Sequence, residues 1–376
     1  MIRFGWLSIV LLIGAVQGAV VAGLLLGRAT NRTANRLLGA FLLAFVLQIV
    51  PYIIGFAGFY MAYPWLSFAP FSITLVYGPL LYLYVARITA DGLPARWWVH
   101  LIPGALQATY YLVVFAHPLP FKNDWDLRIQ EPFVDPVESL LTFLSLGGYL
   151  VAAILRYRRY ERWLRDETSD PDLYSLSWVR TFLVLFTATV VLDAGFETYS
   201  RFVQHLTYLR FFWLYAWYAA LAYYLALEGW RNAGRAYPQP LIVAPAAAPP
   251  PEIRKPAFDL AAAAEEFRER LIASDHWRDP GLTLPLLAER MAISPTQISR
   301  FVNDGLGQNF TETVNRIRVQ AVQERLRDPA ETRDILTLAL DAGFNSKASF
   351  NRCFRAFTET TPTEFRNSVT RRLQPE

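Results

Sequence analysis

The feature that most constrains this chain is a series of long apolar runs that ends near Gly229. A helix that crosses a lipid bilayer needs about 20 mainly apolar residues. Seven stretches meet this requirement. They are Phe4–Leu26, Leu37–Phe59, Ala69–Ala86, Trp97–Ala116, Val137–Leu155, Trp178–Ser200 and Tyr208–Leu227. We therefore expect residues 1–235 to form a seven-helix transmembrane bundle.

The remainder of the chain has the composition of a soluble protein. Over all 376 residues the hydrophobic share is 53%, above the usual 45–50% or so, and the excess lies before the stretch 236–256. That stretch contains seven prolines, which prevent a continuing helix and favour extended conformations. We expect three parts: the membrane domain 1–235, a semi-rigid linker 236–256 and a soluble domain 257–376.

The basic residues between the apolar runs predict the orientation of the bundle. The first, third and fifth loops carry ten Arg or Lys residues, whereas the N-terminus and the other loops carry four. Loops rich in Arg and Lys stay in the cytoplasm. We therefore expect a multi-pass protein of the bacterial cytoplasmic (inner) membrane, with its N-terminus outside and residues 257–376 in the cytoplasm.

The first apolar run, Phe4–Leu26, is longer than the 7–15-residue apolar core of a cleaved signal peptide, so we expect a permanent span. It contains two glycine pairs, Gly14 with Gly18 and Gly23 with Gly27. This spacing lets two helix backbones approach closely. The partner could be another helix of the bundle or, in a homodimer, a second copy of the chain.

Charged residues in the spans indicate a candidate sensor pocket. Asp193 and Glu197 share one helix face because they are four residues apart, and charges within a bilayer are costly and often functional. In the expected topology both lie in the outer third of the sixth span, and other polar residues at the ends of spans lie near the same depth. The candidate pocket therefore comprises His117, Glu138, Asp193, Glu197, Arg201 and Arg210. It could take a small ligand or respond to pH. The alternative is a local pair of Glu197 and Arg201 whose long side chains reach water.

Asp193 belongs to a pentapeptide, LDAGF, that occurs twice, at Leu192–Phe196 and at Leu340–Phe344. The first copy follows more than ten apolar residues, which places it inside a span. The second copy precedes a polar stretch, where Gly343 is expected to form a turn because glycine tolerates a positive φ. We interpret the two copies as a coincidence of sequence with different structures.

Several kinds of chemistry find no support in the sequence. The single cysteine, Cys353, excludes an intramolecular disulfide and a cysteine-based metal site, and we expect it to pack in the core. The only lysines are Lys122, Lys255 and Lys347; none lies in a span, which excludes a retinal Schiff base. There is no HExxH motif and no nucleotide-binding glycine loop. We therefore predict no enzyme, no cofactor, and neither a catalytic nor a metal site.

Helical signals dominate beyond residue 257. The predicted helices are Ala262–Leu271, Thr283–Met291, Pro295–Asn303, Phe310–Arg327, Thr332–Asp341, Ser346–Phe357 and one that begins at the capping box Thr361–Glu364. Ser294 is a predicted N-cap, with Gln297 completing a capping box. A short helix, a turn and a polar-faced helix occur on each side of the long helix, which indicates two helix-turn-helix motifs. The predicted fold is all-α throughout.

The polar-faced helices carry side chains that could contact base edges and phosphates of double-stranded DNA. The candidate DNA-binding residues are Thr296, Gln297, Arg300, Ser346, Lys347, Ser349, Asn351, Arg352 and Arg355. Arg352 is expected to bind phosphate, with a structural contact as the alternative. Gln297, Arg300, Lys347 and Asn351 are candidates for base readout. On the opposite side, Phe344, Phe350 and Phe354 are expected in the core.

Charge supports this assignment only locally. Residues 257–376 carry 16 basic and 17 acidic side chains, so bulk charge gives no support for DNA binding. Within residues 345–372, however, there are six basic side chains and only two acidic ones. A cationic face on a neutral domain is sufficient for an electrostatic footprint on DNA.

The C-terminal region resembles the AraC/XylS family of bacterial transcription regulators. The resemblance rests on GFNSKASFNRCFR, from Gly343 to Arg355, and on TPTEFR, from Thr361 to Arg366. Leu287-Ala288, Ser294-Pro295, Ile298-Ser299-Arg300 and Asn315–Arg318 also fit the family pattern. Over Leu282–Arg366 the resemblance implies that both polar-faced helices enter successive major-groove segments, about 34 Å apart. Ala348 stands where the family often has serine, and Glu359 where glycine is usual.

These patterns predict a membrane-embedded regulator whose bundle senses a signal and whose soluble domain binds specific DNA. The expected partners are double-stranded DNA, the lipid bilayer, a small-molecule or peptide signal, RNA polymerase and a second copy of the chain. A signal could alter bundle packing or dimerisation, and so the local concentration of paired DNA-binding domains. The alternatives are a passive membrane anchor and a transporter with a regulatory tail.

Overall fold

The computed structural model describes residues 2–90, 92–204, 206–240, 259–328 and 330–373. In these ranges every regular element is a helix, and extended pairing is limited to a single bridge between Thr168 and Thr283. Residues 241–258, which include most of the predicted linker, lie outside the described ranges. The chain divides into two compact units. One comprises Met1–Arg158 and Leu176–Gln239, and the other comprises Arg159–Ser175 and Pro240–Glu376.

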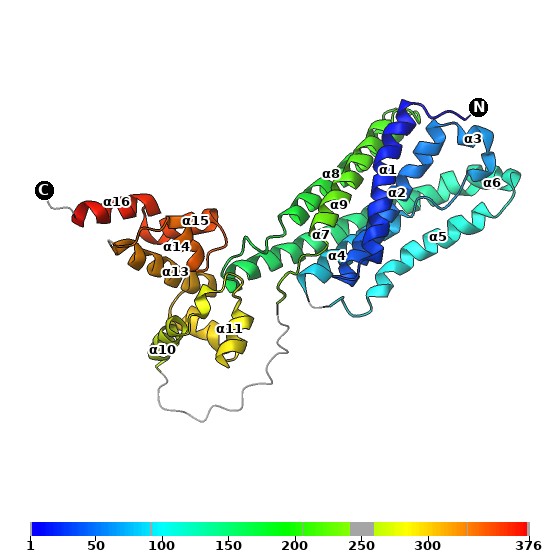
Figure 1. Cartoon of the computed structure of the whole chain (residues 1–376). Coiled ribbons are helices and arrows are strands. Elements are labelled where there is room, and N and C mark those ends of the chain that lie inside the picture. The colour runs from blue at the N-terminus through cyan, green and yellow to red at the C-terminus, as the bar shows by residue number, and fades with distance from the viewer. Residues whose placement is uncertain (1, 91, 205, 241–258, 329, 374–376) are drawn as a thin grey trace, which may run out of the picture. The chain divides into compact units, whose positions relative to one another are not determined.

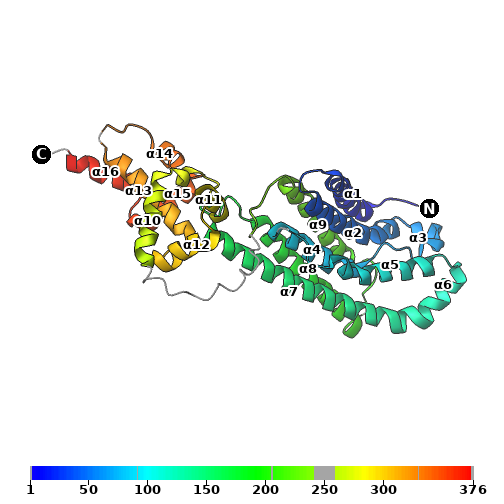
Figure 2. The same ribbon diagram turned by 90° about the horizontal axis from the view of Figure 1, so that it is seen from below.

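The first unit is a bundle of helices (Figure 1). Its helices are α1 (Trp6–Gly27), α2 (Arg32–Phe56), α3 (Phe59–Ala62), α4 (Tyr77–Thr89), α5 (Ile102–Phe115), α6 (Leu119–Trp125), α7 (Asp135–Glu167, up to Arg158), α8 (Ser177–Phe202) and α9 (Phe212–Asn232). Helices α1, α2 and α9 pack side by side, as Figures 1 and 2 show from two directions. Between α6 and α7 the helix widens into a π-helical turn, η4 (Asp126–Val134).

Five stretches of the described chain are long and apolar enough to cross a membrane. They are Trp6–Gly27, Arg32–Phe56, Trp97–Phe115, Leu119–Glu167 and Ser177–Ser200. These contain or overlap the first, second, fourth, fifth and sixth predicted spans. The last predicted span corresponds to α9, which begins at Phe212 rather than at Tyr208.

The predicted third span, Ala69–Ala86, is wrong in its first part. Helix α4 begins only at Tyr77 and has 13 residues. Pro70 disfavours the helical conformation at Ala69, and Phe68 has a φ of +64°, which turns the chain. A 3₁₀ turn, η2 (Thr74–Val76), then leads into α4. The apolar composition predicted a hydrophobic segment here, but the proline moved its helical start.

The first glycine pair of α1 packs within the bundle. A Cβ atom on Gly14 would lie 2.8 Å from the Cβ of Ala219 in α9, and one on Gly18 would lie 2.7 Å from Val46 in α2. Both glycines therefore allow close contact between helices of one chain. A Cβ atom on Gly23, in contrast, would have no neighbouring atom within 4 Å among the described residues.

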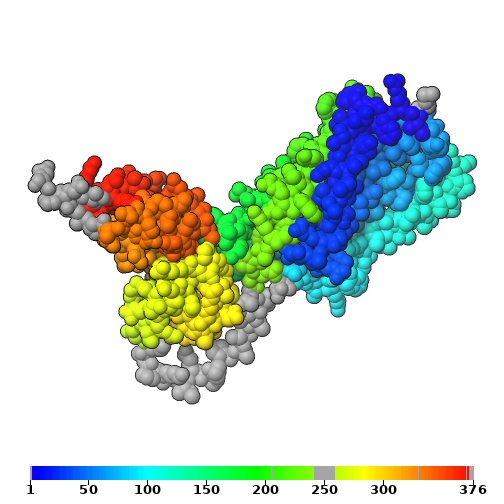
Figure 3. Space-filling view, viewed as in Figure 1, coloured from blue at the N-terminus to red at the C-terminus, as the bar shows by residue number. Residues whose placement is uncertain are grey.

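Helix α1 lies at the surface of the first unit (Figure 3, blue), and its opposite face exposes a stripe of large apolar side chains. Ile9, Ile13, Val16, Val20 and Leu24 are between 46% and 63% exposed. Their spacing of three to four residues puts them on one side of the helix. A contiguous exposed apolar face of this kind indicates contact with lipid or with another apolar surface.

The second unit is built on α13 (Phe310–Arg327), the long helix predicted at these bounds. The other helices are α10 (Leu260–Ala273), α11 (Leu284–Met291), α12 (Pro295–Arg300), α14 (Ile335–Asp341), α15 (Lys347–Thr358) and α16 (Pro362–Leu373), with a π-helical turn η6 (Phe301–Gly305) after α12. Helix α13 contacts η6 as well as α14, α15 and α16. A single apolar core, which includes Phe267, Ile298, Phe310 and Phe350, joins both halves of this unit.

Side-chain caps set the helix boundaries of the second unit. Ser294 and Ser346 accept hydrogen bonds from the backbone N–H groups of Gln297 and Ser349, at the starts of α12 and α15. The capping box of Thr361 with Glu364 forms as predicted. The predicted start of α14 at Thr332 is wrong, because Asp334 caps the helix and delays its first residue to Ile335.

Candidate functional site

Two polar-faced helices of the second unit carry most of the candidate DNA-binding residues. Helix α12 follows α11 after the short turn 292–294, in which Ala292 has a φ of +54°. The Ser294 cap fixes its first turn, and Ile298 is fully buried. Thr296, Gln297 and Arg300 are exposed on the other side. Helix α12 therefore presents one hydrogen-bonding and cationic surface to solvent.

Helix α15 is positioned by the tight turn that follows α14. Gly343 has a φ of +91°, and a Cβ atom there would meet the backbone oxygen of Arg278 at 2.5 Å. Phe344 then enters the core, with its ring centroid 5.3 Å from that of Phe350, which in turn lies 5.4 Å from Phe354. All three rings are buried as predicted. Because its aromatic side is held in the core, the opposite, polar side of α15 points to solvent.

The polar side of α15 is exposed and cationic. Lys347, Asn351, Arg352 and Arg355 are exposed, whereas Ser349 is only 2% exposed. The Ser346 hydroxyl is occupied as the helix cap. Of the candidate residues on α15, Ser349 is therefore the one that the structure places in the interior.

A cleft of about 620 Å³ lies beside this polar side. It is lined by α14, α15 and the start of α16, and its basic lining residues are Lys347, Arg355 and Arg366. The guanidinium of Arg366 donates hydrogen bonds to the carbonyls of Glu331 and Arg333, which holds its charge at the edge of the cleft. Such a cationic, hydrogen-bonding cleft can receive phosphate oxygens.

Arg318 is the buried polar centre of the second unit. It is 0% exposed, and its guanidinium donates to the carbonyls of Trp277 and Asp279 at 2.8 and 2.7 Å and to the Ser169 hydroxyl at 3.1 Å. Burial lowers its pKa to about 10, an effect that the nearby carboxylate of Asp170 opposes. The side chain is therefore charged at neutral pH and holds three segments together.

Two acidic residues reach the start of α15 from the segment after α7. Asp172 Oδ2 accepts a hydrogen bond from Arg352 Nη1 at 2.7 Å, and this bond raises the pKa of Arg352. Asp170 accepts hydrogen bonds from Asn345 Nδ2 at 3.1 Å and from the Ser349 hydroxyl at 3.5 Å. Sequence reasoning missed both aspartates. The excess of acidic residues at 166–172, within an otherwise arginine-rich loop, was the available signal.

Cys353 lies on the inner side of α15, half-buried and free. Burial raises the pKa of its thiol, so the thiolate that reacts with electrophiles is scarce at neutral pH. This environment agrees with the expected packing role.

The candidate sensor residues belong to the first unit and bind different neighbours. Glu138 of α7 accepts hydrogen bonds from Gln107 and Tyr111 of α5 at 2.6 and 2.7 Å. Asp193 of α8 accepts one from the Tyr218 hydroxyl of α9 at 2.8 Å. The two carboxylates thus bridge separate helix pairs.

The other candidate sensor residues have varied surroundings. Glu197 is half-buried one turn after Asp193. His117 is exposed and its ring contacts that of Phe121 in a tilted arrangement, with centroids 4.2 Å apart. Arg210 is exposed and donates to Gln204. The side chain of Arg201 lies outside the described residues, and with it the alternative pairing of Glu197 and Arg201.

Tyrosines surround Asp193 in a pattern that the sequence did not reveal. Tyr52 of α2 stacks on Tyr215 and on Tyr208, with ring centroids 3.4 and 4.6 Å apart. The Tyr208 hydroxyl donates to the carbonyl of Pro51, which lies in the interior of α2. The Asp193–Tyr218 hydrogen bond is thus part of a tyrosine-rich contact between α2, α8 and α9.

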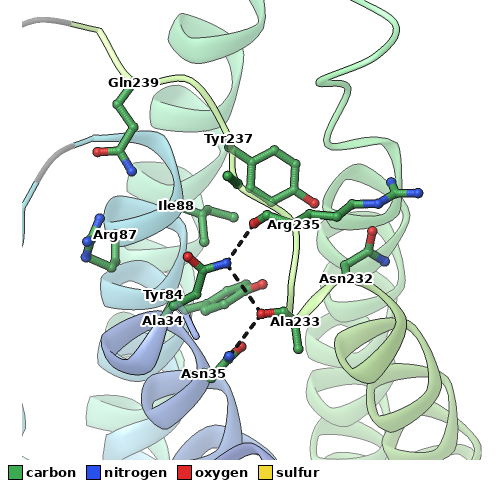
Figure 4. Close-up of a pocket in the computed structure, with 12 residues that line it drawn as sticks. Ala34, Asn35, Tyr84, Arg87, Ile88, Asn232, Ala233, Arg235, Tyr237 and Gln239 are labelled. Atoms are coloured by element: carbon green, nitrogen blue, oxygen red, sulfur yellow. Dashed lines mark hydrogen bonds between the residues drawn. The ribbon is translucent and has the colours of Figure 1, made fainter. Parts of the chain in front are cut away.

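A separate hollow of about 240 Å³ lies at the start of α2 and the ends of α4 and α9 (Figure 4). Asn31 and Asn35 donate hydrogen bonds to the carbonyls of Ala233 and Arg235 across it. Arg87 and Tyr237 also contribute to its lining. The candidate sensor residues do not line this hollow, so the bundle offers more than one polar site.

Comparisons with known proteins concern the second unit. A family model described as a helix-turn-helix domain matches residues 287–368. The probable transcription factor PqrA of Proteus vulgaris is 30% identical over 93 residues, which are 25% of this chain and 75% of PqrA. No solved structure matches the chain.

Further relatives are uncharacterized HTH-type transcriptional regulators of Staphylococcus aureus, strains MSSA476 and N315. Each is 35% identical over 85 residues, which are 23% of this chain. The chain spans 11% of the length of these relatives. The residues matched by the family model run from within α11 to within α16, and they include the turns, caps and polar faces described above. Through this region the chain belongs to the AraC-type helix-turn-helix family of DNA-binding transcription regulators.

Proposed function

We propose that the protein is a membrane-embedded regulator that binds specific double-stranded DNA through two helix-turn-helix motifs, α11–α12 and α14–α15. The observation that carries this proposal is the same local design on both sides of α13. In each half a short capped helix is followed, within two residues of its end, by a residue with positive φ, Ala292 or Gly343. A serine then caps the following helix, whose polar side faces solvent. This is the design in which the second helix enters a major groove.

In this proposal the exposed side chains divide by role. Gln297, Arg300, Lys347 and Asn351 contact base edges, while Arg355 and Arg352 contact phosphate. Thr296 and Ser346, near the N-terminal ends of α12 and α15, complete the contact surface, whereas the buried Ser349 is not part of it. RNA polymerase and a second copy of the chain are further proposed partners.

The first unit is proposed to span the bacterial cytoplasmic membrane seven times. The five apolar stretches supply five spans, α9 supplies a sixth, and the apolar segment 69–89, of which α4 is the helical part, supplies the seventh. The exposed apolar stripe on α1 supports contact with lipid acyl chains. Basic loops keep the second unit in the cytoplasm. Because a signal must be received in the bundle, the proposed sensing groups are Asp193 with Tyr218, and Glu138 with Gln107.

The DNA-binding part is tested with the full-length protein in lipid nanodiscs. Duplexes are selected from a random-sequence pool, and affinity is then measured at several salt concentrations. Lys347→Ala and Asn351→Ala should relax the sequence preference at individual positions, by about 1–3 kcal/mol each. Arg355→Ala should weaken binding to all sequences and reduce the salt slope by about one.

Arg270→Ala is the matched control for Arg355→Ala, because Arg270 is an exposed arginine on α10. It should change neither affinity nor salt slope. If the full-length protein enriches no sequence from the pool, sequence-specific DNA binding is excluded.

The membrane part is tested by replacement. If residues 1–158 and 176–235 only anchor the protein, unrelated spans in their place will preserve regulation of a reporter gene. The sensor proposal expects that such a chimera loses its response while it still binds the selected duplex.

A further inference from the structure

The second unit contains a segment that comes from far outside the DNA-binding region. Residues Arg159–Ser175, here called the docking segment, comprise the end of α7 and the connection to α8. They belong to the same compact unit as residues 240–376. The proposal below concerns what this segment does there, and it rests on the DNA-binding function proposed above.

The middle of the docking segment is anchored through buried hydrogen bonds. The backbone N–H of Ser169 donates to the Leu282 carbonyl at 3.0 Å, next to the bridge of Thr168 with Thr283. The Thr311 hydroxyl donates to the Thr168 carbonyl, and Asn315 Nδ2 donates to the Ser169 carbonyl at 2.9 Å. Thr168 and Ser169 are at most 1% exposed. Backbone groups paired in the interior are costly to separate, so this anchor is a stable part of the unit.

The docking segment also completes the surroundings of Arg318. Its Ser169 hydroxyl accepts from the Arg318 guanidinium, and Asp170, which is 3% exposed, lies close enough to stabilise the charge. A buried guanidinium requires acceptors for its donors and a nearby negative charge. The docking segment therefore supplies a hydrogen-bond acceptor and a negative charge to the buried Arg318 of α13.

The next residues reach the DNA-contacting side of α15. Asp170 accepts from Asn345 and from Ser349, and Asp172 pairs with Arg352 at 2.7 Å. In contrast to the anchor, the Asp172–Arg352 pair is exposed, with 57% and 58% of the two side chains accessible. Exposed ion pairs contribute little to stability and weaken with salt. We call Asp170–Asp172 the acidic tip. Its Asp172 carboxylate is thus easily displaced from Arg352.

The beginning of the docking segment lies beside α12. Trp163 and Glu167 line a cleft of about 490 Å³ together with Thr296, Ser299 and Arg300. One segment therefore borders the polar sides of both α12 and α15. Carboxylates at these places oppose a DNA backbone because they repel phosphates, and Asp172 in addition occupies the Arg352 guanidinium that would bind one.

We propose that the docking segment is a built-in competitor of DNA. Its anchor stays bound to α13, while the carboxylate of Asp172 holds the guanidinium of Arg352 until a phosphate oxygen replaces it. Both groups are anionic acceptors for the same donors, so only one can be fully bound at a time. Because α7 and α8 flank the segment in the chain, a rearrangement of these helices would move the acidic tip relative to α15. Through this competition between Asp172 and phosphate for Arg352, a change in the bundle can raise or lower the affinity for DNA.

The first test measures binding of full-length variants in nanodiscs to a random-sequence duplex of about 30 base pairs. Asp172→Asn should raise affinity about two- to fivefold, the size of an exposed ion pair, and should steepen the salt slope because Arg352 becomes available to phosphate. Arg352→Gln should lower affinity, and the double variant should show no gain over Arg352→Gln alone. Asp166→Asn is the matched control, since it removes the same charge from an exposed position of the same segment.

Equal affinities of Asp172→Asn and Asp166→Asn would overturn the competition, as would weaker binding by Asp172→Asn. If neither the wild type nor any variant binds DNA, the proposed function itself fails. Binding by the wild type without a difference between the two variants rejects only the competition.

Hydrogen exchange of the unaltered protein gives a second, independent measurement. Addition of the duplex should speed exchange of the amides of Asp172, Leu173 and Ser175, which bond within the tip, by severalfold. The amide of Ser169, in the anchor, should keep its protection. Slower exchange in the tip after addition of DNA would contradict displacement and overturn the inference.

Discussion

The pentapeptide LDAGF occurs in both units and adopts two different structures. In the first copy, Leu192–Phe196, all five residues lie inside α8. In the second copy, Leu340–Phe344, the helix α14 ends at Asp341 and the chain turns at Gly343, with a φ of +91°. The five residues are identical, so the difference arises from what surrounds them.

The aspartates of the two copies have different partners. Asp193 is half-buried and accepts a hydrogen bond from Tyr218, a residue that is 5% exposed in α9. Asp341 is exposed and pairs with Arg333 at 2.8 Å. The first aspartate thus bridges two apolar helices, whereas the second lies in water at the end of a helix.

The glycines and phenylalanines differ as strongly. Gly195 is helical, and nothing in the described chain lies within 4 Å of a Cβ placed on it, whereas Gly343 lies against the backbone of Arg278. Phe196 is half-buried with its ring 5.9 Å from that of Phe211, whereas Phe344 is 2% exposed. Five identical residues therefore do not determine whether the chain turns or which side chain enters the core. Substitutions in each copy can measure how much its surroundings contribute.

Substitution of the two phenylalanines should separate the copies most strongly. Phe344→Ala removes a fully buried ring and should destabilise the second unit by about 3–5 kcal/mol. Phe196→Ala should cost under about 2 kcal/mol, because its ring is partly exposed already. The measurement is hydrogen exchange of helix amides in α13 and α15, and in α8, in the full-length protein. Equal losses of protection in the two variants would show that Phe344 and Phe196 contribute equally to stability.

The glycines provide the next largest contrast. Gly343→Ala places a Cβ 2.5 Å from the Arg278 carbonyl oxygen in a backbone conformation that L-residues disfavour, which should cost at least about 2 kcal/mol. Gly195→Ala should be neutral or stabilise α8 by up to about 1 kcal/mol, because alanine is the better helix former. Thermal unfolding in nanodiscs compares the two variants. A destabilising Gly195→Ala would indicate a helix contact at that glycine that this chain alone does not supply.

Replacement of the aspartates tests their partners. Asp193→Leu leaves the buried Tyr218 hydroxyl without its acceptor and should cost about 1–3 kcal/mol. Asp193→Asn keeps an acceptor and serves as the control. Asp341→Leu should change stability by less than about 1 kcal/mol, since it removes only an exposed ion pair. Hydrogen exchange in α8 and α14 would report each loss locally, and an effect of Asp193→Asn as large as that of Asp193→Leu would show that charge, not hydrogen bonding, matters there.

Local signals predicted the second unit well. The bounds of α13 and the caps at Ser294 and Thr361 follow from residues that contact their own helix. The early start expected for α4 failed for an equally local reason, the proline at position 70. Caps and proline effects can be predicted from the local sequence, because they depend on interactions within a single helical turn.

Contacts between distant parts of the chain could not be derived in this way. Asp172 and Arg352 are 180 residues apart, and no periodicity links them. The candidate sensor residues were grouped by expected depth in the membrane, but Glu138 binds α5 and Asp193 binds α9. In almost uniformly apolar helices the direction of a side chain depends on packing against neighbours, which sequence spacing does not reveal.

The last contrast concerns a further residue with positive φ, directly after α15. Glu359 has a φ of +61°, where the family usually has glycine, and its N–H still closes the helix on the Arg355 carbonyl at 2.9 Å. The turn therefore has the same left-handed backbone as Gly343, but without a residue suited to it. Glu359→Gly should stabilise the second unit by about 1 kcal/mol, whereas Glu359→Ala should not. Unfolding of both variants by denaturant would measure this difference, and no gain with glycine would show that the turn is stabilised by the glutamate side chain itself.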